Sequence, residues 1–122
     1  MNVLEELKKR EPIFHHPEFG VTQKDFEDMT VEDYWEIGAS GQRYDRNYCI
    51  DTVIKRYKNS DYVKNDIWET KDFECREIAP NNYLLTYILI QGIEKRVTRR
   101  ATIWRHVGDQ WKILYHQGTI VL

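Results

Sequence analysis

The period of the apolar pattern changes halfway along the chain, and this change limits the possible folds more than any other feature of the sequence. Before Asp66, apolar residues recur at the spacing of one helix face, most clearly at Ile50, Val53, Ile54 and Tyr57. After Asp66, apolar and polar residues alternate over long stretches, which is typical of β-strands. Helices followed by a run of strands indicate an α+β domain rather than alternating βαβ units.

Local sequence signals divide the first half of the chain further. Proline disfavours helical geometry at the residue before it, so Glu11-Pro12 should end or kink a first helix. Thr22 and Asp45 are residue types that cap helix N-termini, and they predict the starts of a second and a third helix. Two short strands are expected between these helices, at Tyr34–Gly38 and Gln42–Tyr44.

The second half predicts a meander of long strands at Ile67–Ala79, Tyr83–Ile90, Arg96–Arg105 and Trp111–Val121. Hairpin loops of about four residues would fix how these strands pair. Pairing Gln91 with Arg96 sets Tyr87 opposite Arg100. The same loop length in the next hairpin sets Arg100 opposite Tyr115.

This register predicts two faces of different character. One face is aromatic with interspersed polar groups, which suits a pocket lined under the helices. It carries Tyr83, Leu85, Tyr87, Thr98, Arg100, Thr102, Trp104, Trp111, Ile113, Tyr115 and Gln117. The other face is mostly aliphatic, which suits packing against a second copy of the chain in a homodimer. It carries Leu84, Ile88, Ile90, Val97, Ala101, Ile103 and Leu114, with Arg99 and His116 among them.

Arg100 is the most informative residue of the aromatic face. A guanidinium stays charged in proteins, and burying an unpaired charge costs several kcal/mol. Arg100 must therefore meet a carboxylate, reach solvent, or meet an anionic or carbonyl group of a ligand. The candidate ligand-binding residues are Arg100, Tyr87 and Tyr115, which would orient the polar end of a small molecule, and Tyr83, Trp104 and Trp111, which would stack on its apolar part.

Composition excludes several classes of function. The chain has 18 Lys and Arg against 20 Asp and Glu, a net charge of −2, so it lacks the basic face of a nucleic-acid-binding protein. It has no run of about 20 apolar residues, so we expect no membrane span. Cys49 and Cys75 form no CxxC motif, and we interpret them as reduced thiols of a cytoplasmic protein without a cofactor.

Glu11, His15, His16 and Glu18 cluster where the first helix should end. Imidazole and carboxylate groups can bind a divalent metal, but adjacent histidines point apart and no HxH or HxxxH spacing is present. We therefore expect no metal site. A single histidine, His15, could instead line the pocket mouth as an acid or base, with the others in capping or surface roles. The segment Phe14–Gly20 suits a lid.

Glu36 and Arg43 flank the turn Gly38–Gly41 in the two short strands. They could form a structural ion pair near the strand ends. Alternatively, Glu36 could serve as a base in the pocket while Arg43 holds a substrate anion.

Two stretches of the sequence resemble a known superfamily. Tyr34–Gly41 reads YWEIGASG, and near the end of the chain Trp104-Arg105 is followed by Gly108-Asp109-Gln110-Trp111-Lys112-Ile113. With the order of elements, these motifs resemble the nuclear-transport-factor-2-like (SnoaL-like) superfamily, and within it small proteins grouped as a domain of unknown function. The resemblance implies one cystatin-like domain over residues 1–122. In it a curved antiparallel sheet forms a cone around N-terminal helices, usually as a dimer, with a pocket in the cone mouth.

The enzymes of this superfamily use a carboxylate or histidine base deep in the cone, opposite tyrosine or acid donors, and other members do not catalyse reactions. Two functions therefore remain. The first, which we favour, is a dimeric protein whose pocket binds a small apolar ligand with a carbonyl or carboxylate end. The second is an enzyme of lyase, isomerase or hydrolase type, with His15 or Glu36 as the base. A carboxylate or histidine within hydrogen-bond reach of Tyr87, Arg100 or Tyr115, with a pKa shifted by desolvation, would favour the enzyme. A cavity lined only by Arg, Tyr and Thr would favour binding.

Overall fold

The structure, a computed structural model, describes residues 1–122. It contains helices α1 (Val3–Lys8), α2 (Gln23–Met29), α3 (Arg46–Lys58) and α4 (Ser60–Lys64) and a short 3-10 helix, η1 (Pro17–Phe19). Its strands are β1 (Thr30–Ile37), β2 (Arg43–Asp45), β3 (Trp68–Ala79), β4 (Asn82–Gln91), β5 (Arg96–Val107) and β6 (Gln110–Ile120). None of the helices is both long and apolar enough to cross a membrane.

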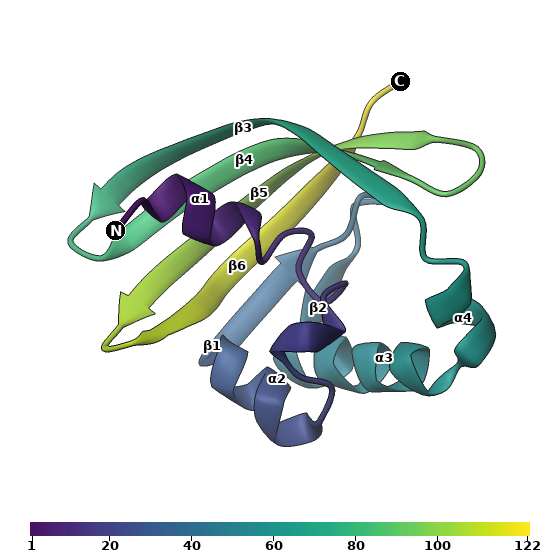
Figure 1. Cartoon of the computed structure of the whole chain (residues 1–122), viewed down its shortest axis with the longest axis horizontal. Helices are drawn as coiled ribbons and strands as arrows, with labels where there is room; N and C mark the ends of the chain where they lie inside the picture. Colours follow the sequence, from purple (N-terminus) through teal and green to yellow (C-terminus); the bar gives the residue numbers. More distant parts are fainter.

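All strands form one six-stranded sheet in the order β2-β1-β6-β5-β4-β3. The sheet is curved and arches over α2 and α3, while α1 lies across β3 to β5 (Figure 1). The predicted α+β class is confirmed. The sheet is mixed rather than purely antiparallel as expected. The pair β1–β6 is parallel, and the other four pairs of neighbouring strands are antiparallel.

Side-chain caps explain where the helices begin. The Asp45 carboxylate accepts a hydrogen bond from the Tyr48 amide at 2.8 Å, as an N-cap of α3 should. Thr22 and Asp25 form a reciprocal capping box at the start of α2. The short α4 was not predicted, and Asn59 caps it by accepting from two backbone amides.

The predicted register of the β4–β5 hairpin is confirmed, since Gln91 pairs with Arg96 and Tyr87 with Arg100. The register predicted for the next hairpin, with Arg100 opposite Tyr115, is wrong. There the turn is tighter, because Val107 already pairs with Gln110. Arg100 therefore lies opposite a different residue, Gly118.

The tighter turn shifts the register by two residues and a β-bulge at Leu114 by one more, and only the odd shift at the bulge changes which face the later side chains lie on. Trp104 pairs with Ile113, but the preceding Ile103 pairs with Tyr115, so Leu114 is an extra residue in β6. A bulge sets two residues of one strand against one of its partner and shifts the alternation of side chains. Beyond it, His116 lies on the face toward the helices, which we call the inner face, and not on the aliphatic outer face as predicted.

The core lies between the inner face and the N-terminal segment. Its larger cluster includes Leu7, Tyr34, Leu85, Leu89 and Ile113, and a smaller one joins α2 to α3. Full burial of a side chain of this size contributes about 1.5–3 kcal/mol. The packing fixes residues 10–16 against the sheet, where they form walls of the cavities described next.

Candidate functional site

A polar cavity of about 310 Å³ lies between the inner face of the sheet, α3 and the segment Pro12–His15. Titratable and charged side chains dominate its walls. They include His15, Glu36, Tyr87, Arg96, Arg100 and His116. The cavity thus contains both candidate bases predicted from the sequence and two of the six predicted ligand-binding residues.

Arg100 projects from β5 into this wall, and all of its partners are neutral. Its Nε donates to the Thr98 hydroxyl at 2.9 Å, and its Nη2 to the Gln91 side-chain oxygen at 3.4 Å. Its Nη1 lies 3.3 Å from Nε2 of His116. None of the ion pairs in the structure involves Arg100. Burial lowers the pKa of Arg100, but a guanidinium remains charged at physiological pH.

Gly118 makes room for this guanidinium. A Cβ atom at position 118 would lie 2.8 Å from Nη1 of Arg100, too close for non-bonded atoms. An alanine there would push the guanidinium away from β6. A glycine inside a strand often marks such a close approach, so Gly118 is a signal in the sequence for this position of Arg100.

His116 orients Arg100 through the contact between its Nε2 atom and the guanidinium. Burial, and then the charge of Arg100, lower the pKa of His116 to about 3, so its ring is neutral. Arg100 can only donate, and Nε2 of His116 must therefore accept. The ring proton is then on Nδ1, which donates to the Thr102 hydroxyl at 2.8 Å.

Glu11, for which the sequence indicated only a metal-binding, capping or surface role, is instead a buried acid that contacts the sheet. Its Oε1 accepts from the Tyr87 hydroxyl at 2.7 Å and from the Ile13 amide at 3.1 Å. Its Oε2 accepts from Nε1 of Trp104 at 2.9 Å. Burial raises the pKa of Glu11. Next to this acid, Thr102, His116 and Arg100 form a second set of contacts, in which His116 lies between the other two.

One feature of the sequence could have pointed to Glu11. Buried tyrosine and tryptophan need hydrogen-bond partners for their polar tips. Tyr87 and Trp104 were both predicted to face inward, and the last three strands supply no inward acid. The acceptor therefore had to come from the N-terminal part of the chain.

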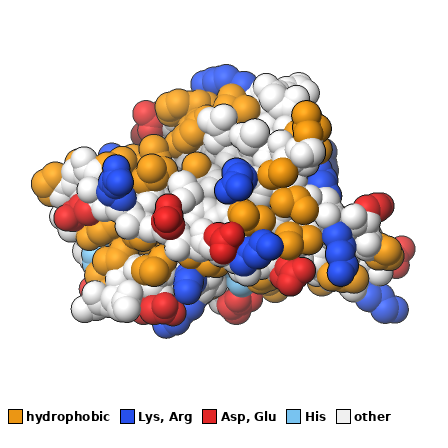
Figure 2. Space-filling view, turned by 90° about the horizontal axis from the view of Figure 1, so that it is seen from above, with side chains coloured by type: hydrophobic (Ala, Val, Ile, Leu, Met, Phe, Trp, Pro, Cys, Tyr) orange, Lys and Arg blue, Asp and Glu red, His pale blue; other side chains and the backbone are white.

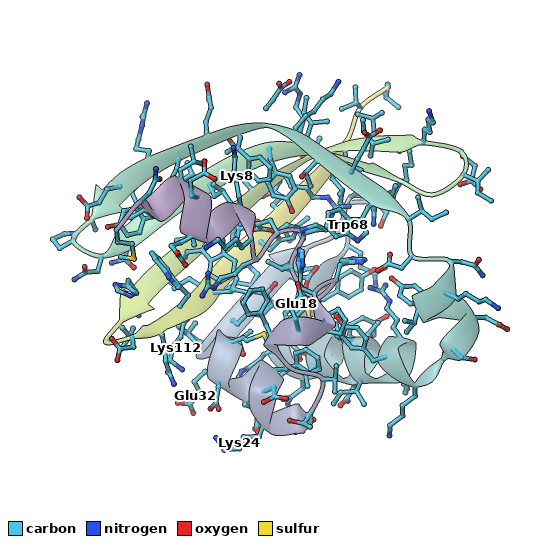
Figure 3. All side chains as sticks on the ribbon, in the orientation of Figure 1. Lys8, Glu18, Lys24, Glu32, Trp68 and Lys112 are labelled. Atoms are coloured by element: carbon cyan, nitrogen blue, oxygen red, sulfur yellow. The ribbon has the colours of Figure 1, made fainter.

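His15 is held in the cavity wall by an acid from a distant part of the chain. Its Nδ1 lies 2.8 Å from a carboxylate oxygen of Asp66, just after α4, and its side chain is only 11% exposed. With Nδ1 donating to the carboxylate, Nε2 carries the free lone pair. The adjacent His16 bonds the Glu18 carboxylate instead and packs against the Trp68 ring at 5.2 Å; Figure 3 labels Glu18 and Trp68.

Glu36 also lies on the inner face, where it accepts from the Tyr34 hydroxyl at 3.1 Å and from the Cys49 thiol at 3.0 Å. Burial raises the pKa of Cys49, so the thiol stays protonated and can donate. The ion pair considered for Glu36 and Arg43 does not form. Arg43 pairs with Ile37, and Ile37 and Trp35 share the face of β1 opposite to Glu36. The Arg43 guanidinium therefore lies over the Trp35 ring, 5.7 Å from its centroid.

Comparison with solved structures identifies the fold. The chain superposes on an NTF2-like protein from Cytophaga hutchinsonii with a TM-score of 0.67 and 15% identity, covering 98% of this chain and 95% of the other. The fold is NTF2-like. A proposed ketosteroid isomerase from Parabacteroides distasonis gives a TM-score of 0.66 at 17% identity, covering 98% and 89%. A proposed calcium/calmodulin-dependent protein kinase type II association domain from Thiobacillus denitrificans gives 0.67 at 10% identity, covering 94% of each chain.

No protein-family model matches the sequence, and neither does any curated protein. At these identities, structural likeness establishes the NTF2-like fold and leaves the chemistry to be argued from the site.

The remaining predicted ligand-binding residues of this NTF2-like chain lie outside the polar cavity. Trp104 and Trp111 line a second cavity of about 300 Å³. Tyr83 packs edge-on against Trp111 at 5.7 Å and lines neither cavity. Tyr115 lies beyond the bulge, where it packs against Trp35 at 5.0 Å. The six residues are therefore not brought together in one site.

Proposed function

We propose that the polar cavity binds a small ligand through a carboxylate or carbonyl oxygen that accepts hydrogen bonds from Arg100. One observation carries this proposal: the charged guanidinium lies in a cavity wall and has only neutral partners. The charges of Glu36 and Glu11 act on Arg100 without a direct contact, whereas a ligand carboxylate would contact the guanidinium and could accept two parallel N–H bonds. Arg56 and Arg96 also line the cavity and favour an anionic ligand over a cationic one.

Contacts within the protein already hold the guanidinium in place. Thr98, His116 and Gln91 each bond one of its nitrogens, and Gly118 allows it to lie against β6. Such an arrangement reduces the side-chain entropy lost on binding, which favours affinity for a small ligand.

The Arg100→Met variant is expected to weaken binding of hexanoate or benzoate by about tenfold to a hundredfold, because hydrogen bonds to charged groups contribute about 1.5–3 kcal/mol. Isothermal titration measures the affinity, and native mass spectrometry of the purified protein shows whether a compound is retained. The matched control is Arg99→Met, since Arg99 is the adjacent arginine of the same strand, is exposed, and does not line the polar cavity. Equal affinities of Arg100→Met and the wild type would contradict the proposal.

A second candidate function is proton transfer by an enzyme of lyase, isomerase or hydrolase type. The supporting observation is the 2.8 Å contact that orients His15 through Asp66 beside the same cavity, with Glu36 as the alternative base. The similarity in fold to a proposed ketosteroid isomerase agrees with this class. A ligand whose carboxylate binds Arg100 would present its neighbouring carbons to these bases.

The criterion set from the sequence also favours an enzyme, since Glu11 bonds Tyr87 and His116 contacts Arg100, and burial shifts the pKa of both. We still place binding first, because both groups already have partners within the protein.

For this candidate we expect the protein to catalyse exchange of the protons next to the ketone of 4-oxopentanoate, on C3 and C5, for deuterium. NMR in deuterated water measures the rate of this exchange. His15→Gln should slow the exchange by about 10²–10⁴-fold, the usual contribution of a general base, and Asp66→Asn should slow it less. Glu18→Gln is the control, because Glu18 bonds the adjacent His16. No exchange in the wild type would contradict proton transfer on this class of substrate, and exchange that survives His15→Gln would assign the base to another residue.

We also propose that the chain forms a homodimer through the outer face of the sheet. Helices leave this face uncovered (Figure 1), and Figure 2 views the molecule from above, opposite α2 and α3, where hydrophobic patches lie between charged groups. Half-buried aliphatic residues along β4 and β5 support the proposal, among them Leu84, Ile90, Val97 and Ile103. One structural neighbour is named as an association domain. The same native mass spectra test this, since a monomer mass at micromolar concentration would contradict it.

A further inference from the structure

The two cavities of the inner face lie on opposite sides of one short segment. The polar cavity of about 310 Å³ holds Arg100 and His15, and the second cavity, of about 300 Å³, has a floor of aromatic and aliphatic side chains and a polar rim. We call it the apolar cavity after its floor. Ile13 and Phe14 line both. These two residues therefore separate the cavities.

The Phe14 ring packs against aromatic rings near both cavities. Its centroid lies 5.8 Å from the Phe26 ring, which lines the apolar cavity, and the two rings meet edge to face. It also lies 6.4 Å from the Tyr34 ring, whose hydroxyl bonds Glu36 of the polar cavity.

The backbone of Phe14 adopts a conformation that aromatic residues rarely take. Its φ is 65°, in the left-handed region that favours glycine. Tertiary contacts hold it there, because the Tyr57 hydroxyl donates to the Phe14 carbonyl at 2.7 Å and the Tyr57 ring stacks on Phe26 at 6.0 Å. Strained residues that surrounding contacts hold in place are typical of functional positions. The ring position is thus imposed by the fold.

The second cavity is suited to an apolar group. Its floor consists of buried side chains, among them Phe26, Trp104, Trp111 and Ile113. Some polar groups at its rim are already used within the protein, since Asp25 caps α2 and Arg10 bonds Glu6, whereas Asp109 and Gln110 make no side-chain hydrogen bond. The carboxylates of this rim disfavour a second carboxylate there, whereas a hydrocarbon chain would bury apolar surface against the floor.

We propose that Phe14 is the residue that determines ligand length: its ring ends the polar cavity, so the protein binds compact carboxylates, and without the ring the apolar cavity receives the tail of an elongated carboxylate. This inference rests on the proposed binding of a carboxylate by Arg100. A cavity of 310 Å³ corresponds to about ten water volumes at 30 Å³ each, which fits a compact ligand.

The experiment compares linear carboxylates from butanoate to decanoate, titrated into the wild type and into Phe14→Gly. Glycine accepts the positive φ and removes the ring. We expect the affinity of the wild type to stop rising with chain length once the polar cavity is full. In Phe14→Gly it should rise by about fourfold for each further methylene, the value expected for burial of one CH₂.

Two further variants make the result specific. Phe14→Leu keeps a smaller side chain and should raise the maximum chain length of the bound carboxylate by less than Phe14→Gly does. If circular dichroism shows that Phe14→Gly is unfolded, the chain-length profile of Phe14→Leu alone tests the role of Phe14. Phe19→Leu is the control, because Phe19 lines only the apolar cavity at an exposed position and should leave the chain-length profile unchanged.

The outcomes separate this inference from the function on which it rests. Short carboxylates that bind with the same chain-length profile in the wild type and both Phe14 variants would overturn the role of Phe14 and leave the function of Arg100 in place. If no carboxylate bound any of the proteins, the proposed function would itself be refuted.

Discussion

Glu11→Leu is expected to lower the free energy of unfolding by about 4 kcal/mol or more. The Glu11 side chain is 1% exposed and accepts hydrogen bonds from Tyr87, Trp104 and the Ile13 amide. Leucine fills much of the same space but accepts none of them. Each buried donor left without a partner costs about 1–3 kcal/mol. Domains of this kind are stable by about 5–15 kcal/mol, so the loss would unfold a substantial fraction of the protein on mild heating.

Urea unfolding followed by tryptophan fluorescence measures this effect. Glu11→Gln should cost less than leucine, because its amide oxygen still accepts, although its NH₂ group cannot accept from a donor. Glu5→Leu is the control, since Glu5 is exposed on α1 and should change stability by no more than about 0.5 kcal/mol. A Glu11→Leu protein as stable as the wild type would mean that the network contributes nothing to folding.

The second large effect is a loss of stability in acid that His116→Gln removes. The pKa of His116 is lowered to about 3 in the folded protein, against an ordinary value near 6.5. The unfolded chain therefore binds a proton that the folded protein excludes. Stability from this residue is complete above about pH 6.5 and is lost progressively as the pH falls toward 3. Between pH 7 and 4.5 the loss is on the order of 3 kcal/mol.

Glutamine can replace the neutral ring, since its oxygen accepts from Arg100 and its NH₂ group donates to Thr102. His116→Gln should match the wild type at pH 7 and exceed it at pH 4.5, as measured by urea midpoints at both pH values. Glu11 acts in the opposite sense, because a raised carboxyl pKa stabilises the folded protein more as the pH falls. Both proteins retain Glu11, so their difference reports on His116. Parallel acid losses in the two proteins would contradict the prediction.

Local features of the structure could be predicted from the sequence because local chemistry determines them. Caps such as Asp45 act on amides a few residues away, and the pairing of Tyr87 with Arg100 follows from counting back from a turn. The bulge at Leu114 could not be predicted in this way. No residue type there requires a bulge, and its position depends on how β6 fits both β5 and β1. For this reason Tyr115 was predicted on the inner face and His116 on the outer face, whereas the structure places each on the other face.

The polar contacts of the site were beyond local reasoning for a different reason. The Asp66 partner of His15 lies 51 residues away, and Glu11 meets Tyr87 and Trp104 across 76 and 93 residues. Only the three-dimensional packing decides such pairs. The sequence did indicate that partners were missing, because Arg100 and the inward-facing Tyr and Trp residues required hydrogen-bond partners that their own strands did not supply.

The bulge also links the length of β6 to the chemistry of the cavity. Deleting Leu114 would remove the bulge and straighten the strand. His116 and Gly118 would still face inward, because every other residue of β6 would keep its present partner in β5. Deleting His116 instead would also straighten the strand, but it would bring Tyr115 to the inner face beside Arg100. In this fold, a change of one residue in strand length can therefore exchange an imidazole for a phenol in the cavity without substituting any side chain.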